Sequence, residues 1–302
     1  MTIPMTFAPD VAAAKDNGTP IVALESTIIT HGMPYPQNVE TARLVEADVR
    51  AGGAVPATIA VLNGTLHIGL TDAELDSLGQ AQNVAKLSRA DIAACIATGG
   101  TGATTVAATM IAAHLAGIKV FATGGIGGVH KGAETTFDIS ADLNELAQTP
   151  VTVVAAGAKA ILDLEKTYEV LETLGVPVIA YGQDTLPAFW SATSALPAPL
   201  RMDSAADIAA AHEMRVAMAL PGGQLVTNPI PSEAQIPAET LAPIIAQALA
   251  EADDQGISAK AVTPFLLGRI FELTDGASLI ANIALVRNNA RLAAQIAGSL
   301  AP

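Results

Sequence analysis

The chain has 302 residues, of which 51% are hydrophobic and 15% are charged, so we expect a compact folded protein with a sizeable core. Fifteen Lys and Arg against twenty-nine Asp and Glu give a formal net charge of −14, which is the wrong sign for binding nucleic acid or an anionic membrane surface. The length permits one large α/β domain or two smaller domains.

The N-terminal part of the chain alternates between strand and helix patterns. Residues 1–18 contain no basic start followed by a long apolar region, so no secretory signal is expected and a cytoplasmic location is predicted. A β-branched run predicts a strand over 20–26, and apolar residues at helical spacing predict a helix over 39–53. Asn63-Gly64 between two apolar runs predicts a β-hairpin, because both residues tolerate positive φ.

The stretch 92–118 carries no formal charge and is long enough to span a bilayer. Three glycines within 99–102 would break such a helix, so we predict a strand over 92–98, a glycine loop and a helix that ends at Gly117. No membrane partner is therefore expected. The single cysteine, Cys95, excludes a disulfide or a cysteine-rich zinc site within one chain.

The middle of the chain repeats a strand, loop and helix pattern. Apolar strands are predicted over 118–123, 151–156 and 177–182, with a glycine-rich loop over 124–132 and an amphipathic helix over 159–175. This βαβ pattern predicts an α/β fold with three layers, α/β/α, around a largely parallel or mixed central sheet.

Beyond these strands the predicted elements are mostly helical. The uncharged, proline-punctuated segment 185–200 predicts an irregular packed region. Helices are predicted to begin at Ser204 and Pro237, and a last helix covers 277–300. No linker or internal repeat separates these parts, so residues 1–302 are expected to form a single domain.

Several residues near predicted strand ends could carry chemistry. The glycine-rich turns 99–105 and 124–132 could hold a phosphate through backbone N–H groups, although ordinary tight turns explain them equally well. Lys159 follows an apolar strand, where its amine could form a Schiff base with a sugar; a surface lysine at a helix start is the alternative. Glu25 also ends a strand, and it could transfer protons or simply cap a helix.

A short acidic segment and the histidines offer further candidates. Asp138, Ser140 and Asp142 could hold a hard divalent cation or sugar hydroxyls, or they could form an Asx turn with a helix cap. His130 follows the second glycine loop and could donate to a phosphate, whereas the role of His31 is open. No paired-histidine spacing typical of a zinc site occurs.

Five strings extend these observations over nearly the whole chain: VALESTIITHGMPYPQN, PATIAVLNGTLHIGL, GATTVAATMIAAHLAGIKVFATGGIGGVHKGAETTFDISADL, AAGAKAILDL and LIANIALVRNNA. Together and in this order they resemble the pseudouridine-5′-phosphate glycosidase family, also called the indigoidine synthase A-like family. The resemblance implies a reversible reaction that converts pseudouridine 5′-phosphate and water into uracil and ribose 5-phosphate. It also implies a divalent cation, typically Mn²⁺, and a homotrimer.

The resemblance also assigns roles to individual residues. Lys159 corresponds to the nucleophile that forms a Schiff base with the ring-opened ribose, and Glu25 corresponds to the proton donor. Asp138 matches the metal ligand. The remaining matches are substrate contacts: Lys86, Val106, Thr123, His130, Ser140, Ala141, Asp142 and Asn282.

Two other functions are compatible with the residues alone. Another Schiff-base lyase or aldolase that acts on a phosphosugar would also use Lys159, but it would not release uracil. A noncatalytic phosphosugar-binding protein would hold its ligand through the glycine loops, with Lys159 protonated and inert.

Overall fold

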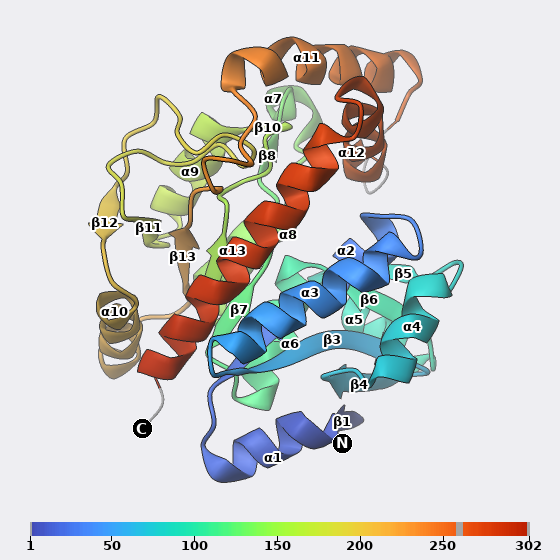
Figure 1. Cartoon of the computed structure of the whole chain (residues 1–302), viewed down its shortest axis with the longest axis vertical. Coiled ribbons are helices and arrows are strands. Elements are labelled where there is room, and N and C mark those ends of the chain that lie inside the picture. The colour runs from blue at the N-terminus through green and yellow to red at the C-terminus, as the bar shows by residue number, and fades with distance from the viewer. Residues whose placement is uncertain (1, 258–261, 301–302) are drawn as a thin grey trace.

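The computed structural model describes residues 2–257 and 262–300 (Figure 1). Its strands are β1 (Met5–Phe7), β2 (Ile21–Leu24), β3 (Val55–Leu62), β4 (Thr65–Ile68), β5 (Ala85–Leu87), β6 (Gly102–Thr104), β7 (Val120–Ala122), β8 (Val129–His130), β9 (Thr152–Ala155), β10 (Leu162–Asp163), β11 (Val178–Tyr181), β12 (Leu200–Met202) and β13 (Gln224–Thr227). Its helices are α1 (Pro9–Asn17), α2 (Thr27–His31), α3 (Gln37–Ala51), α4 (Asp72–Gln80), α5 (Arg89–Ala97), α6 (Val106–Ala116), α7 (Ala133–Thr136), α8 (Ala141–Gln148), α9 (Leu164–Thr173), α10 (Ala205–Ala217), α11 (Ala238–Asp254), α12 (Val262–Leu273) and α13 (Ala277–Ser299).

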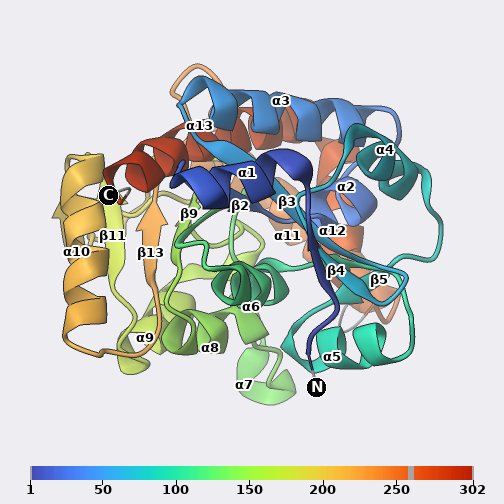
Figure 2. The same ribbon diagram turned by 90° about the horizontal axis from the view of Figure 1, so that it is seen from below.

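Eleven strands of the described part form one mixed sheet in the order β1-β4-β3-β2-β7-β9-β13-β11-β12, with β6 beside β3 and β5 beside β6. The strands from β3 to β12 in this order run parallel to one another, whereas β4 and β6 are antiparallel to β3. Helices α3 and α13 lie on one side of the sheet, and α6 and α8 lie on the other (Figure 2). The predicted α/β fold with a largely parallel or mixed central sheet is confirmed.

The central strands are apolar because helices cover both faces of the sheet. Strands β7 and β9 are buried at every position, and β2 is buried at three of its four positions. The predicted hairpin joins β3 to β4, with Asn63 and Gly64 at φ 50° and 75°. These positive φ values explain why the turn needs this residue pair.

Two predicted elements take a different form. The stretch 92–98, predicted as a strand, lies mostly in α5, which begins with a capping box between Ser88 and Asp91. Its alanines favour a helix, and the capping box stabilises the first turn of that helix. The prediction of a strand did not take this cap into account. Strand β13 was not predicted, yet it lies between β9 and β11 in the sheet.

The helix predicted over 159–175 begins later, at Leu164. The Asp163 side chain caps it by accepting a hydrogen bond from the Lys166 N–H at 3.1 Å. Lys159 therefore lies in the loop between β9 and β10, and not on a helix.

One hydrophobic cluster includes residues from Ala8 to Leu300, so both ends of the chain contribute to it. The organisation as a single domain stays a prediction. Among residues 2–257 and 262–300, no helix combines the length and the apolar character needed to cross a bilayer. The stretch 92–118 is divided among α5, β6 and α6, which agrees with the prediction that it does not form one membrane-spanning helix.

Candidate active site

Three predicted site residues follow three neighbouring strands. Strands β2, β7 and β9 are adjacent and parallel, so their carboxyl ends lie at the same edge of the sheet. Glu25 follows β2, Thr123 follows β7, and Lys159 lies in the loop after β9. Ligands of open α/β sheets bind at this edge, which makes it the candidate site.

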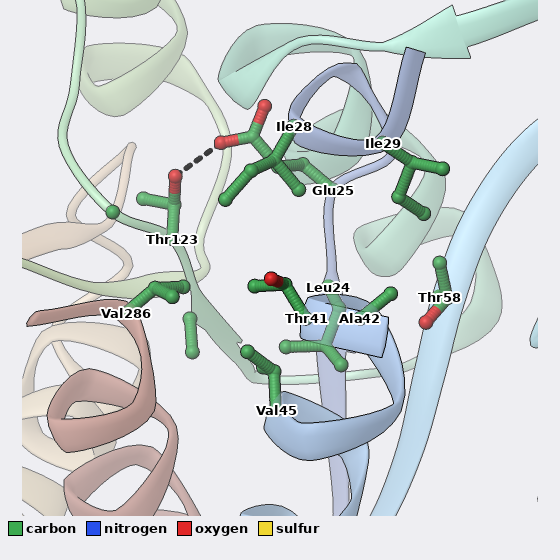
Figure 3. A pocket seen from close by; sticks show the side chains of 12 residues that line it. Leu24, Glu25, Ile28, Ile29, Thr41, Ala42, Val45, Thr58, Thr123 and Val286 are labelled. Atoms are coloured by element: carbon green, nitrogen blue, oxygen red, sulfur yellow. Dashed lines mark hydrogen bonds between the residues drawn. The ribbon is translucent and has the colours of Figure 1, made fainter. Parts of the chain in front are cut away.

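Glu25 is held by two threonine hydroxyls. Thr123 Oγ1 donates to Glu25 Oε1 (Figure 3), and Thr27 Oγ1 donates to Glu25 Oε2. Because each carboxylate oxygen has its own donor, the plane of the carboxylate is fixed. No sequence pattern pointed to Thr27, although it lies only two residues after Glu25.

A buried amide network fixes the backbone at Thr123. Asn289 of α13 is fully buried, and its Nδ2 donates to the Thr123 carbonyl at 2.8 Å. Asn228, just after β13, donates in turn from Nδ2 to Asn289 Oδ1 at 3.1 Å. The sequence offered no signal for this network, because it joins residues 61 and 166 positions apart.

The loop that carries Lys159 is paired with the second glycine loop. The Ile126 N–H donates to the Gly157 carbonyl, and the Lys159 N–H donates to the Ile126 carbonyl, both at 3.1 Å. The hydroxyl of Tyr168 accepts from the Ala158 N–H at 3.4 Å. Burial raises the pKa of Tyr168 to about 12, so this phenol stays neutral beside the lysine.

The charges of three other predicted site residues act on His130. It is half-buried, and burial together with the positive charges of Lys159 and Lys86 lowers its pKa, while the charge of Asp138 opposes the shift. The imidazole is therefore neutral near pH 7. Lys86, Asp138 and Lys159 are thus close enough for their charges to act on His130, and the His130 backbone N–H donates to the Asp138 carbonyl at 3.0 Å.

The sequence left the role of His31 open. The charge of Lys86 acts on this histidine as well. Burial and the charge of Lys86 lower the pKa of His31. Its Nδ1 lies 2.6 Å from Thr30 Oγ1. Helix α2, which starts two residues after Glu25, thus brings a second neutral imidazole toward Lys86.

Asp142 joins three backbone segments. It is 6% exposed, its Oδ1 accepts from the Ala107 N–H at 3.0 Å, and its Oδ2 accepts from the Gly127 N–H at 2.8 Å. A Cβ atom on Gly127 would lie 2.3 Å from Ser140 Oγ, so close packing demands glycine here. Asp142 thus holds the second glycine loop against the starts of α6 and α8.

Val106, Ser140 and Ala141 mark two helix N-termini that Asp142 ties together. Val106 is the first residue of α6, Ala141 is the first residue of α8, and Ser140 caps α8 by accepting from the Asp142 N–H at 3.2 Å. Helix N-termini favour anions because their first N–H groups have no partner within the helix. Asp142 already takes the Ala107 N–H and Ser140 takes the Asp142 N–H, so a phosphate would bind the N–H groups that remain at these two termini.

Asn282 lies on α13, one turn before Leu285 and Val286. Val286 lines a cavity together with Glu25 (Figure 3), which places this part of α13 beside the strand ends. Asn282 Oδ1 accepts from Nε1 of the fully buried Trp190 at 2.8 Å.

Asp138 is the predicted metal ligand. Within the described residues, no hydrogen bond or ion pair joins its carboxylate to another side chain. Nor do three or more His, Cys, Asp or Glu residues of these ranges gather in an arrangement that could hold a metal ion. Asp138 could therefore offer a cation one carboxylate, with water as the other ligands.

The chain matches the family model described as Indigoidine synthase A like protein over residues 10–299. It is 73% identical over 300 residues to the pseudouridine-5′-phosphate glycosidase of Jannaschia sp. (strain CCS1), with 99% of each chain covered. It is 57% identical over 296 residues to the pseudouridine-5′-phosphate glycosidase of Geobacillus kaustophilus (strain HTA426), with 98% of each covered.

Two solved structures are also similar. The prealnumycin C-glycosynthase AlnA, in complex with ribulose 5-phosphate, superposes with a TM-score of 0.92 at 40% identity, covering 100% of this chain and 98% of that one. An indigoidine synthase A-like protein from Thermotoga maritima superposes with a TM-score of 0.90 at 32% identity, covering 99% and 97%.

Proposed function

The chain belongs to the indigoidine synthase A-like protein family, and we propose that it cleaves the C-glycosidic bond of pseudouridine 5′-phosphate with water to give uracil and ribose 5-phosphate. The observation that carries this function is the similarity over nearly the full length to proteins named for that activity. The site agrees with it, because Lys159 and Glu25 follow the strands on either side of β7.

Ring opening is the first step of the proposed reaction. The lone pair of Lys159 Nζ forms a bond to C1′ of the ribose as the C1′–O4′ bond breaks, and Glu25 gives its proton to O4′. The new ammonium then returns a proton to Glu25. This route suits a base that is bound through carbon and lacks the departing nitrogen of an ordinary nucleoside.

Uracil leaves in the second step. Glu25 gives its proton to C5 of the base, the C1′–C5 bond breaks, and the lysine nitrogen forms a double bond to C1′. Water then hydrolyses this Schiff base, which releases ribose 5-phosphate and the Lys159 amine, and the remaining proton restores Glu25. The lysine nitrogen thus supplies an electron pair to C1′ as the C1′–C5 bond breaks and its electrons pass to the base.

The 5′-phosphate is proposed to bind near the starts of α6 and α8. Val106, Ser140 and Ala141 mark these helix N-termini, and the cation Lys86 and the neutral His130 lie in the same site. In a chain with a net charge of −14, the Lys86 ammonium would supply positive charge to this anionic group.

The donor set fits a divalent cation that is bound mainly by water. Asp138 would hold Mn²⁺ through one carboxylate, and the cation would polarise a substrate oxygen and screen the phosphate charge. Asp138 also lies near enough to His130 to act on the pKa of that residue. The Asp138 carboxylate would therefore lie close to the proposed phosphate site.

We propose that the protein is located in the cytoplasm and forms a homotrimer. The cytoplasmic location is supported by the single cysteine, since no disulfide can form within one chain. Subunit contacts would cover large apolar side chains that are exposed in the isolated chain, such as Met214, Met218 and Phe137 at 60%, 62% and 82% exposure. Sedimentation equilibrium would measure the number of subunits.

The function is tested by chromatography of uracil released from pseudouridine 5′-phosphate. Wild-type protein with Mn²⁺ should release uracil, and chelation with EDTA should slow the release at least about tenfold. Lys159→Ala should lower kcat by about a thousandfold or more while circular dichroism shows a folded protein. Lys166→Ala is the matched control, because Lys166 is exposed and pairs with Glu134 and Asp163.

Other results would favour a different function. Folded wild-type protein that traps a phosphosugar on Lys159 but releases no uracil would be another Schiff-base lyase or aldolase. Protein that binds phosphosugars with no turnover would be a binding protein. Normal turnover by Lys159→Ala would contradict the assignment of the nucleophile.

A further inference from the structure

A small cavity lies against Glu25 on the α3 side of the sheet. Its volume is about 20 Å³. A water molecule needs about 10–15 Å³ of such space, so the cavity can hold one water molecule and is far too small for a nucleotide. Apolar side chains form most of its wall, and its polar side chains are Glu25, Thr41, Thr58 and Thr123 (Figure 3).

The three threonine hydroxyls differ in their partners. Thr123 donates to Glu25, and Thr58 donates to Glu46 Oε1 at 2.6 Å. Thr41 is 2% exposed, and no residue among 2–257 and 262–300 forms a hydrogen bond with its hydroxyl, whose oxygen keeps some surface that a water molecule can reach. Figure 3 shows the Thr41 oxygen pointing into the space that these side chains enclose.

An unpartnered hydroxyl at such a position is costly. If the cavity were dry, the hydroxyl would lose its hydrogen bonds to water without gaining others, which destabilises the fold. Thr41 could have been valine at no loss of packing volume, which would have left this cavity wall apolar. The hydroxyl therefore points to a ligand in the cavity that can hydrogen-bond.

We propose that the cavity is a binding site for one water molecule, held by the Thr41 hydroxyl and in contact with the Glu25–Thr123 pair. The ligand must be small and must both donate and accept hydrogen bonds, because a hydroxyl lies on one side and a carboxylate on the other. Water meets these conditions.

Such a water molecule would hydrogen-bond to Glu25, whose protonation state changes during the proposed reaction. In the proposed function, on which this role rests, Glu25 gives and takes a proton in each step. A bound water can turn to donate to the carboxylate or to accept from the carboxylic acid, so it can hydrogen-bond to both forms. Thr41 is thus a positioning residue that acts on Glu25 through the water molecule.

Thr41→Val tests the site, because it removes the hydroxyl and keeps the shape. We expect kcat for uracil release to fall about tenfold with KM changed less than about twofold. Thr41→Ser keeps the hydroxyl and should retain the wild-type kcat. Ala42→Val, which fills the cavity from a neighbouring position and leaves Thr41 intact, should lower kcat like Thr41→Val.

A crystal structure of the wild-type protein gives the direct readout. It should show an ordered water within hydrogen-bond distance of Thr41 Oγ1, and the Thr41→Val structure should lack it. Thr41→Val protein with wild-type kcat and a higher Tm would overturn the proposal, because that is the behaviour of a dry cavity with a costly hydroxyl. A wild-type structure without the water would overturn it too.

This experiment separates the water site from the proposed function. If wild-type protein releases no uracil, the function fails, and the crystal structures still decide whether the cavity binds water. If uracil is released and no water is seen, the function stands and the water site falls.

Discussion

Glu25 receives hydrogen bonds from Thr27 and Thr123, one on each carboxylate oxygen. A proton donor works best when its carboxylate is held in one orientation toward the reacting atoms. At the scale of single residues, the proposed chemistry therefore depends on the two threonine hydroxyls that hold this carboxylate. Thr123, matched by resemblance to a substrate contact, already commits its hydroxyl to Glu25.

Thr123→Val should lower kcat by about ten- to a hundredfold, because Glu25 loses one of its two hydrogen-bond donors. KM should change little, and Thr123→Ser should recover most of the activity. Steady-state kinetics of uracil release measures both constants.

The control for this prediction is Thr149→Val. Thr149 Oγ1 donates to the fully buried carboxylate of Glu145, so the lost interaction is of the same kind. It lies at the end of α8, away from the Glu25 pair. This variant should lose stability and keep its kcat; wild-type kcat in Thr123→Val would contradict the positioning of Glu25.

At the scale of elements, the site depends on how α6, α8 and the second glycine loop meet. Asp142 makes this junction with both of its carboxylate oxygens. The position of the two helix N-termini, and with it the proposed phosphate site, therefore depends on one buried carboxylate.

Asp142→Asn tests the junction, because the amide can accept only one of the two backbone N–H groups and turns an N–H toward the other. The free energy of unfolding should fall by about 1–3 kcal/mol, and KM for pseudouridine 5′-phosphate should rise more than kcat falls. Urea titration and uracil-release kinetics measure these changes. Asp207→Asn, at an exposed helix cap, is the control; an unchanged KM in Asp142→Asn would separate the junction from phosphate binding.

Elements with strong local signals could be predicted from the sequence. The strands that carry Glu25 and Thr123, the hairpin at Asn63-Gly64 and the helix that ends at Gly117 all follow from apolar runs and turn residues. The helix α5 was missed because an alanine-rich run fits a strand or a helix, and only its cap decides. Strand β13 was missed because four residues after two glycines carry little pattern.

At the scale of the whole molecule, buried histidines make stability depend on pH. His212 on α10 is buried with its Nδ1 3.1 Å from Thr152 Oγ1. Burial, with Lys119 and Arg215 nearby, lowers the pKa of His212 below 6.5, and Glu213 opposes the shift. The unfolded chain therefore binds this proton more readily, so its contribution destabilises the fold as pH falls below about 6.5.

His212→Asn should reduce this loss. Between pH 7.5 and 5.5 the free energy of unfolding of the wild type should fall more steeply than that of the variant, by at most about 1.4 kcal/mol per pH unit. Urea titrations at the two pH values measure the difference. His114→Asn changes an exposed imidazole on α6 and should keep the wild-type slope; equal slopes in His212→Asn would show that His212 carries no pH dependence.

The site as a whole could be predicted only in part. Glu25, Thr123 and Lys159 end adjacent parallel strands, so their meeting follows once the strand order is known. The network of Asn228 and Asn289, and the contact of Trp190 with Asn282, join residues 61 and 92 positions apart. Such contacts depend on how helices pack on the sheet, which no local pattern encodes.

The most direct test of the proposed Schiff base on Lys159 is the trapping of this covalent intermediate. Wild-type protein is mixed with pseudouridine 5′-phosphate and sodium borohydride, which reduces a Schiff base to a stable amine, and the peptides are analysed by mass spectrometry. We predict a pentose phosphate adduct on Lys159, and no adduct in Lys159→Ala. Uracil release with no adduct, or with an adduct on another lysine such as Lys86, would contradict the assignment of Lys159 as the nucleophile.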